Sequence, residues 1–307
     1  MTSNNILITI VGPTAIGKTA LSIQLANHFK SDIISCDSRQ FYKEMTIGTA
    51  VPNTNELAAA KHHFIQNRSI FDDYNVGSFE RETLEKLDEL FKENSIQIMV
   101  GGSGLYVDAV LKGLDYFPKV DAKFREELTL ELEKKGIETL QNKLKELDPE
   151  TYSNIALENP HRVIRALEIC IGTETPYSTF INKPKAPRNF HSIKIGLNAD
   201  REIIYNRINQ RVDLMIKDGL LDEAQKLHKH KNLNALQTVG YRELFSYFNG
   251  NFTKEFAISE IKKNTRRFAK RQLTWFKKDE NTLWFDYETD INTIVSEISD
   301  KINVINR

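Results

Sequence analysis

Residues 12–19, Gly-Pro-Thr-Ala-Ile-Gly-Lys-Thr, have the spacing G-x4-G-K-[ST] and lie between an apolar run at 6–11 and a helical pattern at 20–29. A strand that leads through a glycine-rich loop into a helix can bind a diphosphate, because glycines let the backbone curve around an anion and successive N–H groups point at it. Lys18 can reach the outer phosphate, and Thr19 has the hydroxyl that usually ligates Mg²⁺. The sequence therefore predicts a phosphate-binding loop, with Thr19 as a Mg²⁺ ligand, rather than a simple glycine turn. Its members are Gly12, Pro13, Thr14, Ala15, Ile16, Gly17, Lys18 and Thr19.

Asp37 follows a second apolar run, residues 32–36, and is followed by Ser-Arg-Gln. An aspartate at such a place can simply form an Asx turn or cap a helix. At the carboxyl end of a strand beside a diphosphate loop, it can also accept a proton from a nucleophile that attacks next to the diphosphate. We therefore take Asp37 as the candidate general base. An acyl-enzyme mechanism is weaker, since no Ser or Cys lies in a nucleophile-elbow pattern.

Residues 101–106, Gly-Gly-Ser-Gly-Leu-Tyr, repeat the order of strand, glycine turn and helix after an apolar run at 96–100. These glycines can serve tight packing of the turn alone. Ser103 lies at the N-cap position of the next helix, so its hydroxyl can cap that helix or contact a substrate phosphate. Ser103 joins Asp37, Lys18 and Thr19 as a candidate catalytic residue.

Basic residues concentrate in two places. In residues 161–167, the helical period directs Val163 and Ile164 inward and places His161 and Arg165 one turn apart on another face. Residues 262–278 contain eight Lys or Arg and no acid. Such a run is usually a solvated face, but in a neutral protein it is also suited to bind a phosphate backbone, and both interpretations stay open here.

These segments need a scaffold that brings them together. Apolar runs of strand length at residues 6–11, 32–36, 96–100, 193–197 and 283–285 alternate with helical patterns. This alternation predicts a mostly parallel sheet covered by helices on both faces, in which ligands bind beyond the carboxyl ends of the strands. The predicted fold class is α/β, a P-loop NTPase-like core with an inserted all-helical domain.

The alternation stops between about residues 119 and 188. That stretch shows only helical patterns, at 122–135, at 137–147, and from Asn159, a good N-cap that precedes Pro160. We therefore expect the core at residues 1–118, a helical insertion at 119–189, and the rest of the core at 190–307 with a basic C-terminal helix.

The composition limits the class of protein. Lys+Arg and Asp+Glu both number 42 in 307 residues, so any basic surface must be local. Two cysteines, Cys36 and Cys170, cannot build a disulfide framework or a zinc cluster, which fits a reducing cytosol. The polar start of the chain is unlike a signal peptide, and no apolar run is long enough to span a bilayer. We expect a monomer that binds no membrane.

Taken together, the motifs resemble those of the bacterial tRNA dimethylallyltransferases, also called tRNA isopentenyltransferases. The matching segments occur in the family's order, and apart from the first none would identify the family alone. They are residues 12–19, 37–42, 47–50 (Ile-Gly-Thr-Ala), 101–106, 159–168, 239–242 (Val-Gly-Tyr-Arg) and 265–272 (Thr-Arg-Arg-Phe-Ala-Lys-Arg-Gln).

The resemblance implies transfer of a five-carbon allyl group from dimethylallyl diphosphate to N6 of the adenosine 3′ of the anticodon in tRNA. The first loop would hold the diphosphate with Lys18 and a Mg²⁺ ion on Thr19, and Asp37 would accept the proton of the attacking amine. The partner would be the anticodon stem-loop, with one base extruded from its stack. The implied tRNA contacts are Asp37, Ser38, Arg39, Gln40, Ser103, Arg125, His161, Arg162, Val163, Ile164, Arg165, Gln237, Gly240, Tyr241 and Arg242.

Two departures from the family are visible. The family commonly has threonine where Ser103 stands, and serine keeps the hydroxyl but loses the methyl that restricts its rotamer. Eukaryotic relatives carry a C-terminal zinc finger, which two cysteines cannot form.

Three other functions compete. An isopentenyltransferase that acts on free adenine nucleotides would share the loop and Asp37, but it would need neither the helical insertion nor the basic helix. A small-molecule kinase would use ATP at the same loop. A non-catalytic nucleotide switch that binds RNA would not depend on Asp37.

Overall fold

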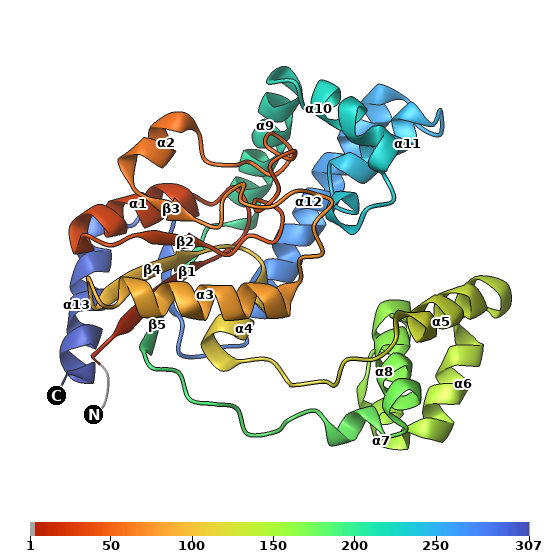
Figure 1. Cartoon of the computed structure of the whole chain (residues 1–307). Helices are drawn as coiled ribbons and strands as arrows, with labels where there is room; N and C mark the ends of the chain where they lie inside the picture. The colour runs from red at the N-terminus through yellow and green to blue at the C-terminus, as the bar shows by residue number, and fades with distance from the viewer. Residues whose placement is uncertain (1–3, 307) are drawn as a thin grey trace. The chain divides into compact units, whose positions relative to one another are not determined.

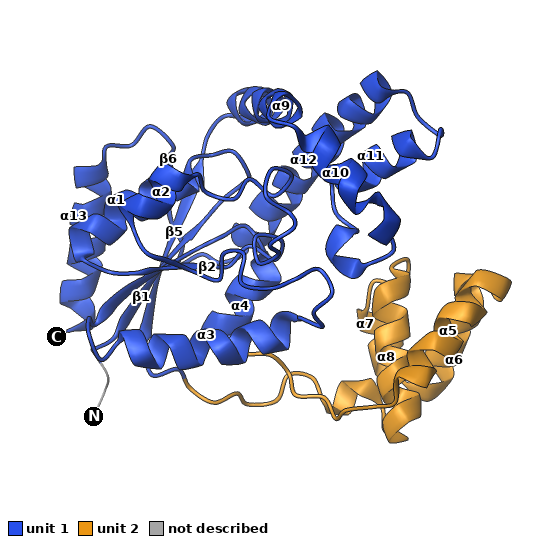
Figure 2. Cartoon of the chain, turned by 45° about the horizontal axis from the view of Figure 1, so that its top comes forward, with its two compact units in different colours: residues 1–112, 188–307 blue, residues 113–187 orange. Residues whose placement is uncertain are grey.

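The computed structural model describes residues 4–306 and divides into two compact units. Unit 1 comprises residues 1–112 and 188–307, and unit 2 comprises residues 113–187 (Figure 2). Unit 2 begins before residue 119 because Gly113 and Asp115 already bond to its far end, accepting from the Lys185 ammonium and the Asn182 N–H.

Unit 1 is built on a central sheet, of which Figure 1 labels β1 to β5. The sheet has six strands in the order β3-β2-β4-β1-β5-β6, and every pairing is parallel. All five predicted strands are confirmed, with ends that shift by up to two residues. The sequence does not predict β3, because two half-buried histidines give no apolar run. The strands are β1 (Ile6–Val11), β2 (Ile33–Ser35), β3 (His62–His63), β4 (Ile96–Val100), β5 (His191–Asn198) and β6 (Leu283–Asp286).

Helices cover both faces of this sheet, as β1 shows. Its residues Ile6, Ile8 and Ile10 enter one apolar cluster with helices α1, α9 and α13, whereas Leu7 and Val11 enter another with α3 and α4. Side chains alternate across a strand, so a continuous apolar run serves a strand buried on both sides. The helices are α1 (Lys18–Phe29), α3 (Val76–Leu90), α4 (Gly104–Lys112), α9 (Arg201–Lys217) and α13 (Ile291–Ile305).

A third apolar cluster in unit 1 joins α9 to α10 (Leu220–Leu227), α11 (Tyr241–Phe248) and α12 (Lys254–Phe276). The basic helix is α12, and it is not the C-terminal helix, since β6 and α13 follow it. The short helix α2 (Thr54–Ala59) has no buried residue. Short 3-10 turns lie at His228–His230 and Asn234–Leu236.

Unit 2 is all helical, with its own core formed by residues such as Leu128, Leu140 and Leu167. Asn159 accepts hydrogen bonds from the N–H groups of His161 and Arg162, which confirms it as an N-cap with Pro160 at the first helical position. The sequence does not predict α7, which is only 6 residues long. The helices are α5 (Ala122–Lys135), α6 (Ile137–Leu147), α7 (Pro149–Asn154) and α8 (Pro160–Thr173), with a 3-10 turn at Tyr177–Thr179.

Candidate active site

The loop between β1 and α1 has the backbone that its glycines allow. Gly12 and Gly17 have φ of 145° and 114°, and a Cβ on Gly12 would lie 2.6 Å from the carbonyl oxygen of Leu197. Ala15 also takes a positive φ of 65°. Positive φ at an alanine is a strained conformation that surrounding contacts must hold. One such contact is the Arg207 Nε, which donates to the Ala15 carbonyl at 2.7 Å.

Lys18 is the first residue of α1, and its side chain folds back into this loop. Its ammonium donates to the carbonyl oxygens of Gly12 and Pro13, at 3.0 and 2.7 Å. Burial and the nearby Arg211 charge lower the pKa of Lys18 to about 8, although Asp37 and Cys36 act in the opposite direction. The ammonium is therefore sensitive to an incoming anion, which would favour its charged form.

Arg207 and Arg211 are functional candidates that the sequence analysis missed. They lie one turn apart on α9, and both line the pocket in front of the loop. Neither forms an ion pair with a carboxylate of residues 4–306. Burial and the neighbouring Arg207 lower the pKa of Arg211. Two guanidinium groups left without a carboxylate beside a glycine-rich loop suit a phosphorylated ligand.

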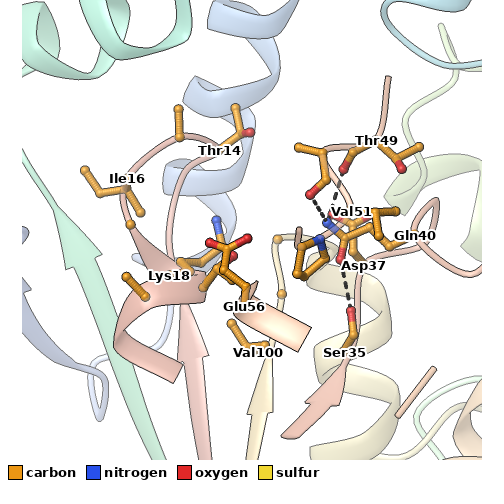
Figure 3. A pocket seen from close by; sticks show the side chains of 18 of the residues that line it. Thr14, Ile16, Lys18, Ser35, Asp37, Gln40, Thr49, Val51, Glu56 and Val100 are labelled. Carbon is orange, nitrogen blue, oxygen red and sulfur yellow. Dashed lines mark hydrogen bonds between the residues drawn. The ribbon is translucent and has the colours of Figure 1, made fainter. Parts of the chain in front are cut away.

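We call this pocket the first pocket. It has a volume of about 320 Å³ and is lined by residues 14–20, Asp37, Gln40, residues 49–53, Glu56 and the two arginines, among others. Figure 3 shows part of this lining, with Lys18, Asp37 and Glu56 among the labelled side chains. The predicted loop residues Thr14, Ala15, Ile16, Gly17, Lys18 and Thr19 all reach its wall. Gly12 and Pro13 are not part of that wall and instead hold the Lys18 ammonium.

Asp37 is half-buried and lies beyond the end of β2, where it lines the first pocket. Its Oδ1 accepts a hydrogen bond from the Arg39 N–H at 3.0 Å, so one oxygen does form the Asx turn. Its Oδ2 accepts no hydrogen bond from the described residues and is free to act on a ligand. The turn and the proton acceptor are therefore compatible in one side chain.

Ser103 supports that turn. Its hydroxyl accepts from the Ser38 N–H at 3.0 Å and donates to the Ser38 hydroxyl at 3.1 Å. The hydroxyl therefore does not cap α4, because both its bonds go to the residue after Asp37, and its contact with a substrate phosphate stays a prediction. Either hydroxyl amino acid can make them, so serine suffices.

Gln272 on α12 connects two loops of the site. Its Oε1 accepts from the Thr14 N–H at 2.9 Å and its Nε2 donates to the Gly102 carbonyl at 2.9 Å. The residue is 5% exposed. Its sequence signal was present, since Gln272 lies on the same helical face as the buried Ala269 and Phe276.

A second pocket, of about 260 Å³, adjoins the first. Six residues line both: Thr14, Asp37, Thr49, Ala50, Arg211 and Phe268. The second pocket also contains Ser38, Arg39, Ser103 and Gly240, and its other walls are largely aliphatic, with Val212, Met215, Leu220, Val239 and Ile261. Asp37 thus lies where the first pocket meets a more apolar one.

Gln40 lines the first pocket, and its side-chain amide is already hydrogen-bonded within the protein. Its Nε2 donates to the carbonyl oxygens of Thr49 and Ala50, at 3.1 and 2.9 Å, and its Oε1 accepts from the Ser35 hydroxyl at 3.2 Å (dashed lines in Figure 3). In this structure Gln40 shapes the wall of the pocket.

Unit 2 carries its own group of predicted residues. His161 and Arg162 are exposed on the first turn of α8 and, with Arg165, line an open pocket of about 750 Å³. Arg125 and Arg165 both donate to Glu168, at 2.6 and 3.1 Å. Burial alone would raise the pKa of Glu168, but these two hydrogen bonds outweigh it and lower the pKa.

Three predicted contacts need correction. Val163, Ile164 and Tyr241 are 0%, 5% and 0% exposed, so their side chains pack in apolar cores and cannot touch a nucleic acid. Gln237 and Arg242 are exposed, and the Gln237 amide donates to the Lys231 carbonyl. For these two, tRNA contact stays a prediction.

The basic run, residues 262–278, lies on α12 and on the two residues after it, and it divides into a bonded part and an exposed part. Lys262 pairs with Asp213 on α9, Lys263 pairs with Glu260, and Arg266 donates to Asn209. Arg267, Lys270, Arg271, Lys277 and Lys278 are exposed and have no ion pair within residues 4–306. The sequence shows no acid in the run, but Asp213 and Glu260 neutralise its first two lysines.

No group of three or more His, Cys, Asp and Glu side chains within residues 4–306 could by itself hold a metal. A Mg²⁺ ion would instead depend on the ligand's own oxygens. Thr19, the second residue of α1, lines the same pocket as Lys18 and the loop, which fits a hydroxyl that ligates Mg²⁺ on a bound diphosphate. Among the helices of the described chain, none has the length and apolar character needed to cross a bilayer.

Comparison with known proteins gives a consistent result. A family model described as IPP transferase matches residues 40–279. A tRNA dimethylallyltransferase of Flavobacterium johnsoniae is 64% identical over 302 residues, which cover 96% of this chain and 98% of the relative. One of Bacteroides fragilis is 45% identical over 92% of this chain and 94% of the relative.

Solved structures agree. The crystal structure of a tRNA isopentenylpyrophosphate transferase from Bacillus halodurans matches with a TM-score of 0.73 at 36% identity and covers 97% of both chains. A eukaryotic dimethylallyltransferase described as acting on tRNA matches with a TM-score of 0.77 at 26% identity and covers 97% of this chain and 77% of that one. The similarity therefore extends over both units.

Proposed function

The chain belongs to the tRNA dimethylallyltransferase family, and from this premise we propose how its two pockets carry out the transfer. The protein is a P-loop-like α/β enzyme that modifies tRNA. Its prenyl donor is dimethylallyl diphosphate, bound in the first pocket. Its acceptor is N6 of the adenosine on the 3′ side of the anticodon, which enters the second pocket after leaving its stack.

The observation that carries this proposal is the position of Asp37 in the wall that both pockets share. The diphosphate would lie on the N–H groups of the loop, with Lys18, Arg207 and Arg211 around it. These cations stabilise the negative charge that develops on the diphosphate as the allylic C–O bond breaks. A Mg²⁺ ion held by Thr19 would supply further charge stabilisation when bound.

The amine of adenine is a weak nucleophile, because its lone pair is shared with the ring. Asp37 Oδ2 accepts a proton from that nitrogen as the new C–N bond forms, and pyrophosphate leaves on the other side. Holding the two reactants in adjoining pockets also removes much of the entropy cost of their encounter.

We assign tRNA recognition to two sets of basic residues. His161, Arg162 and Arg165 form one set in unit 2, and the exposed residues of α12, Arg267, Lys270 and Arg271, form the other. Such groups bind RNA mainly through its phosphates, whereas splayed loop bases supply sequence specificity.

Purified protein incubated with dimethylallyl diphosphate and either unmodified tRNA or AMP tests this function. Nucleoside mass spectrometry should find N6-isopentenyladenosine in the tRNA, and pyrophosphate should be released without ATP. Product on AMP alone would instead favour an enzyme of free nucleotides, and transfer of a labelled γ-phosphate from ATP would favour a kinase.

A further inference from the structure

The wall shared by the two pockets is formed in part by residues 46–51, a run of turns between β2 and α2. Thr49 and Ala50 of this run line both pockets. Ala50 has a positive φ of 52°, which a non-glycine residue adopts only when its surroundings hold it. The position of this wall therefore needs an external support.

Glu223, in the first turn of α10, supplies one support. Its Oε2 accepts from the N–H groups of Thr46 and Ile47, at 3.0 and 2.8 Å. Its Oε1 accepts from the Gly48 N–H at 2.9 Å and from the Tyr241 hydroxyl at 2.6 Å. A carboxylate has about four acceptor positions, and here four donors occupy them.

Tyr241 adds a second support. Its ring packs against Gly48 so closely that a Cβ there would lie 2.6 Å from the ring. Burial and the charge of Glu223 raise the pKa of Tyr241, so its hydroxyl keeps its proton and donates. From the other side, the Gln40 amide holds the carbonyl oxygens of Thr49 and Ala50.

The packing of α10 does not need this carboxylate. The helix is anchored in its apolar cluster by the buried Leu220, Ala224 and Leu227. The Glu223 carboxylate instead accepts hydrogen bonds from the main chain of residues 46–48, next to the wall that lines both pockets.

We propose that Glu223 is a positioning residue for prenyl transfer, whose carboxylate fixes the main chain of residues 46–48 and so places Thr49 and Ala50 in the wall beside Asp37. This inference rests on the proposed function. A displaced wall would loosen the alignment of donor and acceptor, to which transfer rates are very sensitive.

Glu223→Gln tests the proposal with almost no change of shape. In glutamine an NH₂ group replaces one of the two carboxylate oxygens, and an NH₂ group cannot accept a hydrogen bond. The two donors that bonded to that oxygen therefore lose their acceptor, so at least two of the four hydrogen bonds are lost. Asp222→Asn is the matched control, because it removes the same charge from the same helix turn at an exposed position. The readouts are single-turnover transfer at saturating tRNA, the Kd for tRNA, and amide hydrogen exchange of residues 46–48.

For Glu223→Gln we expect single-turnover transfer to fall by about 10- to 100-fold, tRNA affinity to change by less than about threefold, and exchange at residues 46–48 to accelerate. Asp222→Asn should match the wild type in all three. Tyr241→Phe, which removes only one donor, should lower the rate less, and it decides the matter if Glu223→Gln does not fold.

Faster exchange with a normal transfer rate would overturn the proposal, since the wall would then be loose without consequence. So would unchanged exchange and rate in a folded Glu223→Gln variant. A wild-type protein without any transfer activity would instead refute the proposed function, and the exchange data would still report whether Glu223 holds the segment.

Discussion

The loops of unit 1 and the first turn of α8 in unit 2 both carry predicted functional residues, but they hold them very differently. In unit 1 the Thr14 N–H, the Ser38 N–H and the amides of residues 46–48 are each bonded by a side chain far away in the sequence. In unit 2, His161 and Arg162 are exposed and have no ion pair within the described residues. Bond making needs fixed atoms, whereas binding of an RNA phosphate backbone depends mainly on charge.

The largest expected effect is at Asp37. Asp37→Ala should lower single-turnover transfer by about 100- to 10,000-fold, because the acceptor nitrogen loses its general base. The Kd for tRNA, measured by filter binding, should stay within about twofold.

Asp37→Asn sharpens this test, because the asparagine oxygen can still accept the Arg39 N–H and keep the turn. It should be nearly as slow as Asp37→Ala. Near-normal transfer by Asp37→Asn would show that the residue serves the turn alone.

Lys18→Ala should lower kcat/KM for dimethylallyl diphosphate by about 100- to 1,000-fold, because one cation at the leaving group is lost. tRNA binding should not change, which separates this variant from charge changes in unit 2. If Lys18→Ala weakened tRNA binding to a similar extent, Lys18 would not belong to a site that serves the diphosphate alone.

The Lys18 pKa of about 8 predicts that the affinity for a diphosphate depends on pH. Below this value the free enzyme carries the ammonium charge, and above it the charge is lost before the anion binds. The affinity for a non-reactive prenyl diphosphate analogue should therefore weaken as pH rises through 8 in the wild type. Isothermal titration from pH 7 to 9.5 checks this, and Lys18→Ala should show no such break.

On α12, the exposed basic residues should contribute more to tRNA binding than the basic residues in ion pairs. Converting Arg267, Lys270 and Arg271 to glutamine should weaken tRNA binding about tenfold and lower its salt slope. Lys262→Gln with Lys263→Gln is the control, since Asp213 and Glu260 already neutralise these ammonium groups. Equal losses of affinity from both sets would contradict the distinction between paired and exposed residues, and an unchanged salt slope would make this helix face merely solvated.

The smallest effect is expected in unit 2. Arg162→Gln should raise the Kd for tRNA by about two- to fivefold and leave the rate at saturating tRNA unchanged, because this exposed charge touches no reacting atom. A lower rate at saturation would contradict the contrast between the two regions, and would mean that unit 2 helps to align the base.

The sequence alone predicted most of the scaffold, because regular apolar runs and helix caps are local signals. The strand Ile6–Val11 and the helices Ala122–Lys135 and Ile137–Leu147 have the predicted bounds. The two-residue strand β3 was missed, since its place depends on pairing with β2 rather than on its own residues.

The site was harder to predict. The glycine loop and Asp37 carry their own signal, but Arg207, Arg211 and Glu223 gain meaning only when helices far along the chain fold against the loop. Tyr241 illustrates the opposite error, since a motif residue that resembles a ligand contact is buried against Gly48 and Glu223. Hydrogen bonds between distant segments have no pattern in a single sequence.

The most direct test of the central claim is a crystal structure with a non-reactive analogue of dimethylallyl diphosphate and Mg²⁺. The two-pocket arrangement predicts that the diphosphate binds the N–H groups of the loop near Lys18 and that its first carbon faces Asp37. A diphosphate found elsewhere, remote from Asp37, would contradict it.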